Sequence, residues 1–151
     1  MEGYKKALLH DGIEYNEEFI KFCPHGGREV SEIEEAIDQL LDMEKPPDAI
    51  FTASDRITIA SLSLLKKRGI EMPGQIGIGG FSNFSSPELF MPSLTTVVQP
   101  AFEMGKVSAE LLIKLIESKK PINSFEKIVL PTSVQMRNST LKNALDNLPY
   151  V

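Results

Sequence analysis

The sequence has few of the residues that catalytic and metal sites commonly use. Its 151 residues include one cysteine and two histidines. One cysteine excludes an internal disulfide framework, and Cys23-Pro24-His25 offers too few ligands for a structural zinc site. No G-x-S-x-G elbow occurs, and no nucleophile and base stand at a known spacing. We therefore predict no enzymatic activity, no metal and no cofactor.

Long hydrophobic runs are also missing. No apolar run reaches the roughly 18 residues of a membrane-spanning helix. The first residues, MEGYKKALLHDG, lack the apolar centre of a secretion signal. We therefore expect no membrane partner, and the single cysteine fits a reducing cytoplasm, where we expect the protein to work.

The composition is that of an ordinary globular domain. Hydrophobic residues make up 42% of the chain and charged residues 25%, so a sizeable core can form. The formal net charge of −5 gives no indication of a nucleic-acid surface in these residues.

Helix and strand patterns alternate along the chain. Apolar residues at i, i+3, i+4 and i+7 predict the main helices, and Ser31 with Glu34 forms a capping box at the start of one of them. Short β-branched or apolar runs predict strands, and the run at 49–53 is predicted to be a buried parallel strand. The predicted helices cover 2–10, 31–43, 55–68 and 100–118, and the predicted strands cover 19–23, 49–53, 76–81, 94–98, 128–130 and 133–136. This alternation predicts an α/β fold with a mostly parallel sheet flanked by helices.

Polar residues follow three of the predicted strands. They are Ser54 and Asp55, Ser82 and Asn83, and Gln99. In open parallel sheets ligands bind at the carboxyl ends of the strands, and short polar side chains there suit a ligand with hydroxyl groups. Each position has an alternative: Asp55 is favoured as a helix cap, and Ser82 and Asn83 also suit a turn.

The glycines and the phenylalanine of the predicted strand 76–81 each have a structural as well as a functional interpretation. Gly77-Ile78-Gly79-Gly80 does not have the spacing of a phosphate-binding loop, so close backbone packing is favoured. Phe81 is either a core residue or a stacking platform beside the ligand.

Several motifs together resemble the effector-binding domain of the LacI/GalR family of transcriptional regulators. They are Gly3-Tyr4, Ala53-Ser54-Asp55, GFSN at 80–83, PSLTTVVQP at 92–100 and LPTSVQMRNS at 130–139. Each motif alone is weak, but the ordered set covers nearly the whole chain.

The resemblance implies one lobe of a two-lobed, periplasmic-binding-protein-like sensor. We expect a partial effector-binding domain over 1–139, with the C-terminal lobe at 3–98 and 126–139, a helix of the other lobe at 101–118, and a tail at 140–151. It implies that DNA is bound only through an N-terminal helix-turn-helix domain outside this chain. The implied ligand-binding residues are Ser54, Asp55, Phe81, Ser82, Asn83 and Gln99.

The chain departs from the family pattern at two of these positions. The family has an acidic residue where Ser82 stands and an amide where Ser54 stands, so the identity of the effector cannot be transferred. The resemblance implies a sugar-like effector and a homodimer. Its expected contact residues are Ile59, Leu62 and Phe90, for which local core packing is the alternative.

Two other functions compete with a regulator. A periplasmic sugar-binding transport receptor shares the two-lobed fold, but LTTVVQPAFEMG and the closing M-R-N-S favour the regulator. An α/β enzyme is disfavoured because the chain has no nucleophile motif and no metal-ligand set.

Overall fold

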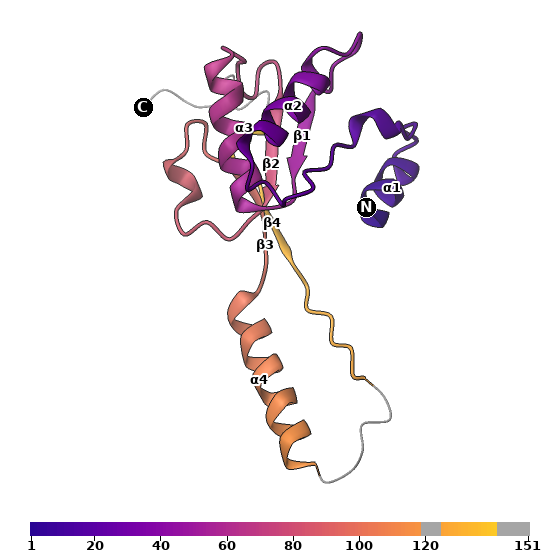
Figure 1. The fold of residues 1–151 in the computed structure, drawn as a ribbon, viewed down its shortest axis with the longest axis vertical. Coiled ribbons are helices and arrows are strands. Elements are labelled where there is room, and N and C mark those ends of the chain that lie inside the picture. The colour runs from indigo at the N-terminus through magenta and orange to yellow at the C-terminus, as the bar shows by residue number, and fades with distance from the viewer. Residues whose placement is uncertain (119–124, 142–151) are drawn as a thin grey trace.

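A four-stranded sheet with the strand order β1-β2-β3-β4 forms the centre of the molecule (Figure 1). The computed structural model describes residues 1–118 and 125–141. The strands are β1 (Ala49–Thr52), β2 (Gly77–Phe81), β3 (Thr95–Val98) and β4 (Ser133–Gln135). The pairs β1–β2 and β2–β3 are parallel, and β4 runs antiparallel to β3. The predicted α/β class with a mostly parallel sheet is confirmed.

Two amphipathic helices, α2 (Val30–Leu41) and α3 (Asp55–Lys67), complete the body. The helix α3 packs on β1 and β2, and α2 packs on α3. The core between them contains the fully buried Ile33, Leu65, Ile78 and Leu94. Burying these large aliphatic side chains contributes most of the stability of the body.

The ends of α3 follow from local chemistry. Ser54 has an extended backbone, and its hydroxyl accepts a hydrogen bond from the Ile57 N–H at 3.4 Å. The cap is therefore Ser54, and the prediction that Asp55 caps this helix was wrong by one residue. At the other end, Gly69 has φ +70°, a conformation that glycine adopts without a steric penalty.

Close packing explains one glycine of β2, Gly80. A Cβ atom added at Gly80 would lie 2.7 Å from Oγ1 of Thr58 and 3.0 Å from Oγ1 of Thr52. The two threonine hydroxyls are buried and bond to each other at 2.6 Å. The prediction of close packing in this strand is confirmed.

Hydroxyl groups also fasten the last described residues to the sheet. Ser139 is fully buried; its Oγ accepts a hydrogen bond from the Thr95 N–H at 2.8 Å and donates one to the Ile78 carbonyl at 2.6 Å. Ser139 therefore joins the end of the described chain to the neighbouring strands β2 and β3.

Four local predictions were wrong. No strand forms at 19–23, because the chain there follows a short 3-10 helix, η1 (Glu17–Phe19), and pairs with no strand. No strand forms at 128–130, where the chain is extended but unpaired. The helix α2 has Glu29 as its N-cap with no side-chain bond, so the capping box at Ser31 does not form. Phe51 is 63% exposed rather than buried, because successive side chains of β1 point to opposite faces and α3 packs on the face of the neighbouring, buried Thr52.

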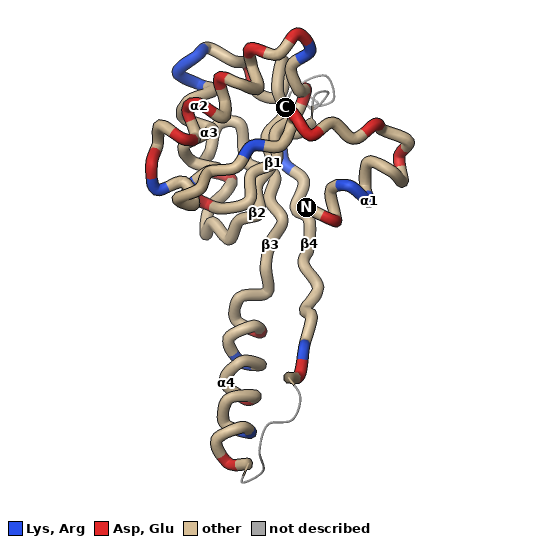
Figure 2. The backbone as a smooth tube through the Cα atoms, turned by 45° about the vertical axis from the view of Figure 1, so that its right-hand side comes forward, with Lys and Arg blue, Asp and Glu red and all other residues tan. Residues whose placement is uncertain are grey.

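Two helices stand apart from the body (Figure 1). They are α1 (Glu2–His10) and α4 (Ala101–Glu117), and neither has a buried residue. The apolar stripe of α4 faces solvent: Phe102 is 82% exposed and Ile116 is 74% exposed. Acidic and basic residues are interspersed along the helices and loops (Figure 2). No helix in the described ranges is long and apolar enough to cross a membrane.

Candidate functional site

The carboxyl ends of β1, β2 and β3 lie at one edge of the sheet because these strands are parallel. The chain continues from them into Ser54, Ser82 and Gln99 respectively. This edge also faces the start of α4, which leaves the body after β3 (Figure 1). The topology thus brings the predicted loops to the same edge.

Asn83 and Gln99 are bonded to each other across this edge. The Asn83 Oδ1 accepts a hydrogen bond from the Gln99 N–H at 2.8 Å, and the Asn83 Nδ2 donates to the Gln99 carbonyl at 3.2 Å. Both distances are those of ordinary hydrogen bonds. The Asn83 carboxamide is therefore engaged with backbone, whereas the Gln99 side chain makes no bond to another described residue.

A polar hollow of about 360 Å³ opens beside this pair, and we refer to it as the sheet-edge hollow. Side chains from the loop after β2, from β3 and its end, and from β4 and the residues after it line it. Its lining residues are Asn83, Phe84, Ser85, Pro87, Glu88, Thr96, Val98, Gln99, Gln135 and Arg137. A hollow of this size, with several convergent donors and acceptors, suits a small polar molecule.

The predicted ligand-binding residues divide into two groups. Asn83 and Gln99 line the sheet-edge hollow, and Ser54, Asp55, Phe81 and Ser82 do not. The Ser54 hydroxyl caps α3, and Asp55 is exposed in the first turn of that helix.

Ser82 is 1% exposed, and its hydroxyl accepts a hydrogen bond from the Phe84 N–H at 3.3 Å. This bond is the one expected of a serine in a turn. Phe81 is half-buried at the end of β2.

Arg137 is a site residue that the sequence analysis did not select. Its guanidinium donates to the Leu94 carbonyl at 2.9 Å, to Thr96 Oγ1 at 3.1 Å and to Gln135 Oε1. Among the ion pairs of the described residues, none involves Arg137. The acceptors of this half-buried guanidinium are all neutral, and Arg137 lines the hollow. The motif LPTSVQMRNS contained the signal, because it places an arginine directly after a closing strand.

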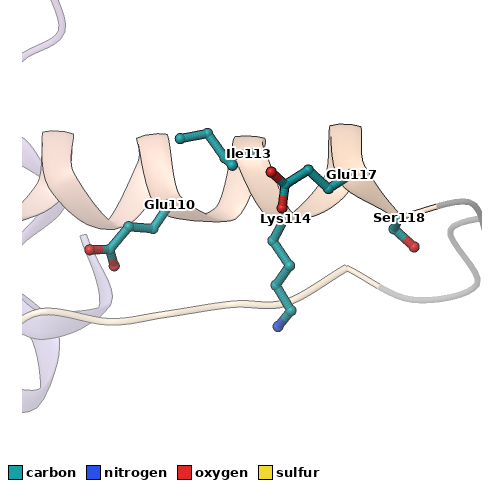
Figure 3. Close-up of a pocket in the computed structure, with 5 residues that line it drawn as sticks. All are labelled: Glu110, Ile113, Lys114, Glu117 and Ser118. Carbon is teal, nitrogen blue, oxygen red and sulfur yellow. The ribbon is translucent and has the colours of Figure 1, made fainter.

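A second hollow lies along α4, far from the predicted residues. It measures about 480 Å³ and is lined by Glu110, Ile113, Lys114, Glu117 and Ser118. The Lys114 side chain points toward the extended chain that runs back to β4 (Figure 3), and its Nζ lies 3.3 Å from a carboxylate oxygen of Glu126. Because one exposed helix supplies all the lining residues, we regard this hollow as the space beside an uncovered helix rather than as a ligand site.

The residues expected at a dimer contact have different environments. Ile59 on α3 is 49% exposed, whereas Leu62 belongs to the hydrophobic core. Phe90 packs on Phe84 with ring centroids 5.1 Å apart. Core packing thus accounts for Leu62 and Phe90, and Ile59 alone of the three presents a largely free apolar surface.

The surroundings of the single cysteine lower its reactivity at neutral pH. Burial raises the pKa of the Cys23 thiol, and the nearby Glu32 carboxylate raises this pKa further. A raised pKa keeps the thiol protonated and weakly nucleophilic at neutral pH. The described residues also contain no group of three or more His, Cys, Asp or Glu side chains that could hold a metal ion.

The mostly parallel sheet and the helices packed on it define the class of the protein as an α/β domain, and comparison with known families narrows this class. The model of the periplasmic binding protein-like domain matches residues 1–140. The chain belongs to this family, and within it to the effector-binding domains of LacI-type transcriptional regulators.

Among curated relatives, the HTH-type transcriptional regulator RegA of Clostridium acetobutylicum is 38% identical over 118 residues, which are 78% of this chain and 34% of RegA. The catabolite control protein A of Priestia megaterium is 30% identical over 140 residues, which are 93% of this chain and 41% of that protein. The chain thus spans well under half the length of these relatives, 34% and 41%. By their names, these two relatives are regulatory proteins rather than enzymes.

Solved structures show the same likeness. The transcriptional regulator CelR in complex with cellobiose superposes with a TM-score of 0.70 at 32% identity, covering 91% of this chain and 40% of that one. The Escherichia coli transcriptional repressor ascG superposes with a TM-score of 0.68 at 25% identity, covering 91% of this chain and 47% of the repressor.

Proposed function

We propose that this chain is the effector-sensing part of a cytoplasmic LacI-type transcriptional regulator. A small sugar-like molecule would bind at the sheet-edge hollow, and a helix-turn-helix segment other than these residues would contact DNA. The mechanism is a population shift, in which the effector stabilises one arrangement of the sensor and so alters DNA affinity. The alternative of a transport receptor is disfavoured because the relatives described above are regulatory proteins.

The observation that carries the proposal is the convergence of polar residues at one edge of the sheet. Gln99 and Arg137 line the same hollow and come from segments on opposite sides of α4 in the sequence. A carboxamide both donates and accepts hydrogen bonds, and a guanidinium donates several. Together they suit the hydroxyl and ring oxygens of a sugar, or a sugar bearing an anionic group.

We propose in addition that α4 belongs to a second lobe that closes over this hollow. The helix has an exposed apolar stripe and no buried residue, which is typical of a surface that another part of a protein covers. Residues 3–98 and 126–139 form the first lobe in this account. We also propose a homodimer in which Ile59 contributes to the contact.

Isothermal titration calorimetry tests the site. Cellobiose, D-glucose and D-glucose 6-phosphate form the panel, since they share hydroxyl groups and differ in size and charge. The variant Gln99→Ala removes the side chain and keeps the backbone bonds to Asn83. We expect about a tenfold loss of affinity for the compound that binds, equal to about 1.4 kcal/mol.

The matched control is Gln39→Ala on α2, where the glutamine bonds only to the exposed Glu35. This control should bind like the unsubstituted protein. Equal affinity in Gln99→Ala, or no heat from any compound in the panel, would contradict the proposed site.

A further inference from the structure

The Asn83 side chain takes the place of a peptide group at the end of the parallel ladder. The ladder between β2 and β3 reaches the pair Phe81–Val97, and the Ser82 N–H then donates to the Val97 carbonyl at 3.1 Å. Beyond this point the two backbones no longer pair. Instead the Asn83 carboxamide bonds to both backbone polar atoms of Gln99. A carboxamide can do this because it carries the same donor and acceptor as a peptide group.

Gln99, whose backbone is hydrogen-bonded to Asn83, lies two residues before the start of α4. The Gln99 carbonyl also accepts a hydrogen bond from the Ala101 N–H at 2.9 Å, and Ala101 is the first residue of α4. Pro100 between them is the N-cap of the helix, with no side-chain bond. The orientation of the first turn of α4 is therefore linked to Asn83 through one carbonyl oxygen.

The contacts that the described residues of α4 make elsewhere are exposed. The helix has no buried residue, and its ion pair with Glu126 is exposed at both ends and leads to the return segment rather than to the body. A surface ion pair of this kind contributes little. The direction of α4 relative to the sheet is thus set mainly where the chain leaves β3.

We propose that Asn83 is a positioning residue that fixes the crossing at Gln99 and thereby sets the direction of α4. Asn83 also lines the sheet-edge hollow, so the same residue connects the hollow to the helix. This role deepens the proposed function, since a ligand that shifts Asn83 would change the direction of α4. In this proposal the main role of Asn83 is to position α4, whereas the sequence motif implied direct contact with the ligand.

The test measures the direction of α4 without any ligand, so it does not depend on whether the proposed effector binds. Nitroxide labels are attached to Lys66→Cys on α3 and Glu117→Cys at the end of α4, both exposed positions, in a Cys23→Ser background. Double electron–electron resonance gives the distribution of distances between the labels. Asn83→Leu, which keeps the approximate volume and loses both hydrogen bonds, should shift or broaden this distribution.

Two further variants separate positioning from general damage. Asn83→Asp keeps the acceptor for the Gln99 N–H and loses the donor, so it should fall between Asn83→Leu and the unsubstituted protein. Asn138→Leu changes an exposed asparagine whose side chain makes no bond to a described residue, and it should leave the distribution unchanged. Thermal unfolding followed by circular dichroism verifies that each variant is folded, and the partial variant serves if Asn83→Leu does not fold.

Hydrogen exchange of the Gln99 amide gives an independent readout. Loss of its acceptor in Asn83→Leu should speed exchange by about tenfold, the factor that corresponds to one ordinary hydrogen bond. The proposal is overturned if the distance distribution in Asn83→Leu equals that of the unsubstituted protein. It is overturned equally if the unsubstituted distribution is already as broad as that of the variant.

Discussion

Replacing Ser139 with alanine should cost more stability than the loss of one small side chain suggests. The serine hydroxyl is fully buried and bonds to the Thr95 N–H and to the Ile78 carbonyl. Alanine at this buried position leaves the Thr95 N–H without its acceptor and the Ile78 carbonyl without the serine donor. An unsatisfied buried group costs about 1–3 kcal/mol. We therefore expect Ser139→Ala to lower the free energy of unfolding by roughly 2–4 kcal/mol.

Urea unfolding followed by far-ultraviolet circular dichroism measures this change, because the chain has no tryptophan to report by fluorescence. The corresponding fall in melting temperature is roughly 5–15 °C for a domain of this size. Ser133→Ala is the matched control: this serine lies on the exposed strand β4, and its side chain makes no bond to a described residue. The control should change stability by less than about 0.5 kcal/mol. A similarly small change in Ser139→Ala would refute the view that this hydroxyl joins the end of the chain to the sheet.

Three further substitutions or reactions test other parts of the structure. Gly80→Ala should destabilise by about 1–3 kcal/mol because its methyl group would lie 2.7 Å from Oγ1 of Thr58, as chemical denaturation would show. Arg68→Met should lower the free energy of unfolding by at most about 1 kcal/mol, because the Arg68–Asp38 ion pair at 2.5 Å is partly exposed. This decrease should become smaller in high salt. A decrease that does not depend on salt would contradict an electrostatic origin. Because burial raises the Cys23 pKa, alkylation by iodoacetamide at pH 7.5 should be slower than that of free cysteine and should accelerate as the pH rises; a fast reaction at neutral pH would show that the thiol is not shielded.

The sequence predicted the body of the fold because its elements have strong local signals. The apolar spacing of α2 and α3 is that of one helix face, and the basic last turn and Gly69 mark where α3 ends. The parallel pairing of β1 with β2 follows from the helix α3 between them, whereas β2 and β3 are joined by a segment that contains only the short 3-10 helix η2 (Pro87–Leu89). Predictions at 19–23 and 128–130 were wrong because an apolar run forms a strand only when a partner strand is available, and sequence alone does not show the partner.

The site was predicted less completely than the fold. Parallel strands bring their carboxyl ends together, so the edge that carries Asn83 and Gln99 could be found from the pattern alone. The bonding of Asn83 to the Gln99 backbone could not, because it depends on how two loops meet after the ladder ends. Arg137 was missed for a similar reason: its guanidinium bonds to Leu94 and Thr96, which are far from it in the sequence.

The predicted dimer residues show the same limit. An apolar residue on α3 serves either the core or an interface, and its helical position alone does not separate the two. The structure assigns Leu62 to the core and leaves Ile59 half-exposed.

The central claim, that a small polar effector binds at the sheet edge, is tested most directly by nuclear magnetic resonance. Cellobiose, D-glucose and D-glucose 6-phosphate are titrated into isotopically labelled protein, and amide and side-chain shifts are followed residue by residue. The account predicts saturable changes that cluster at Thr96, Gln99 and Arg137. Changes confined to the α4 hollow around Ile113 and Lys114, or no changes with any of the three compounds, would contradict it.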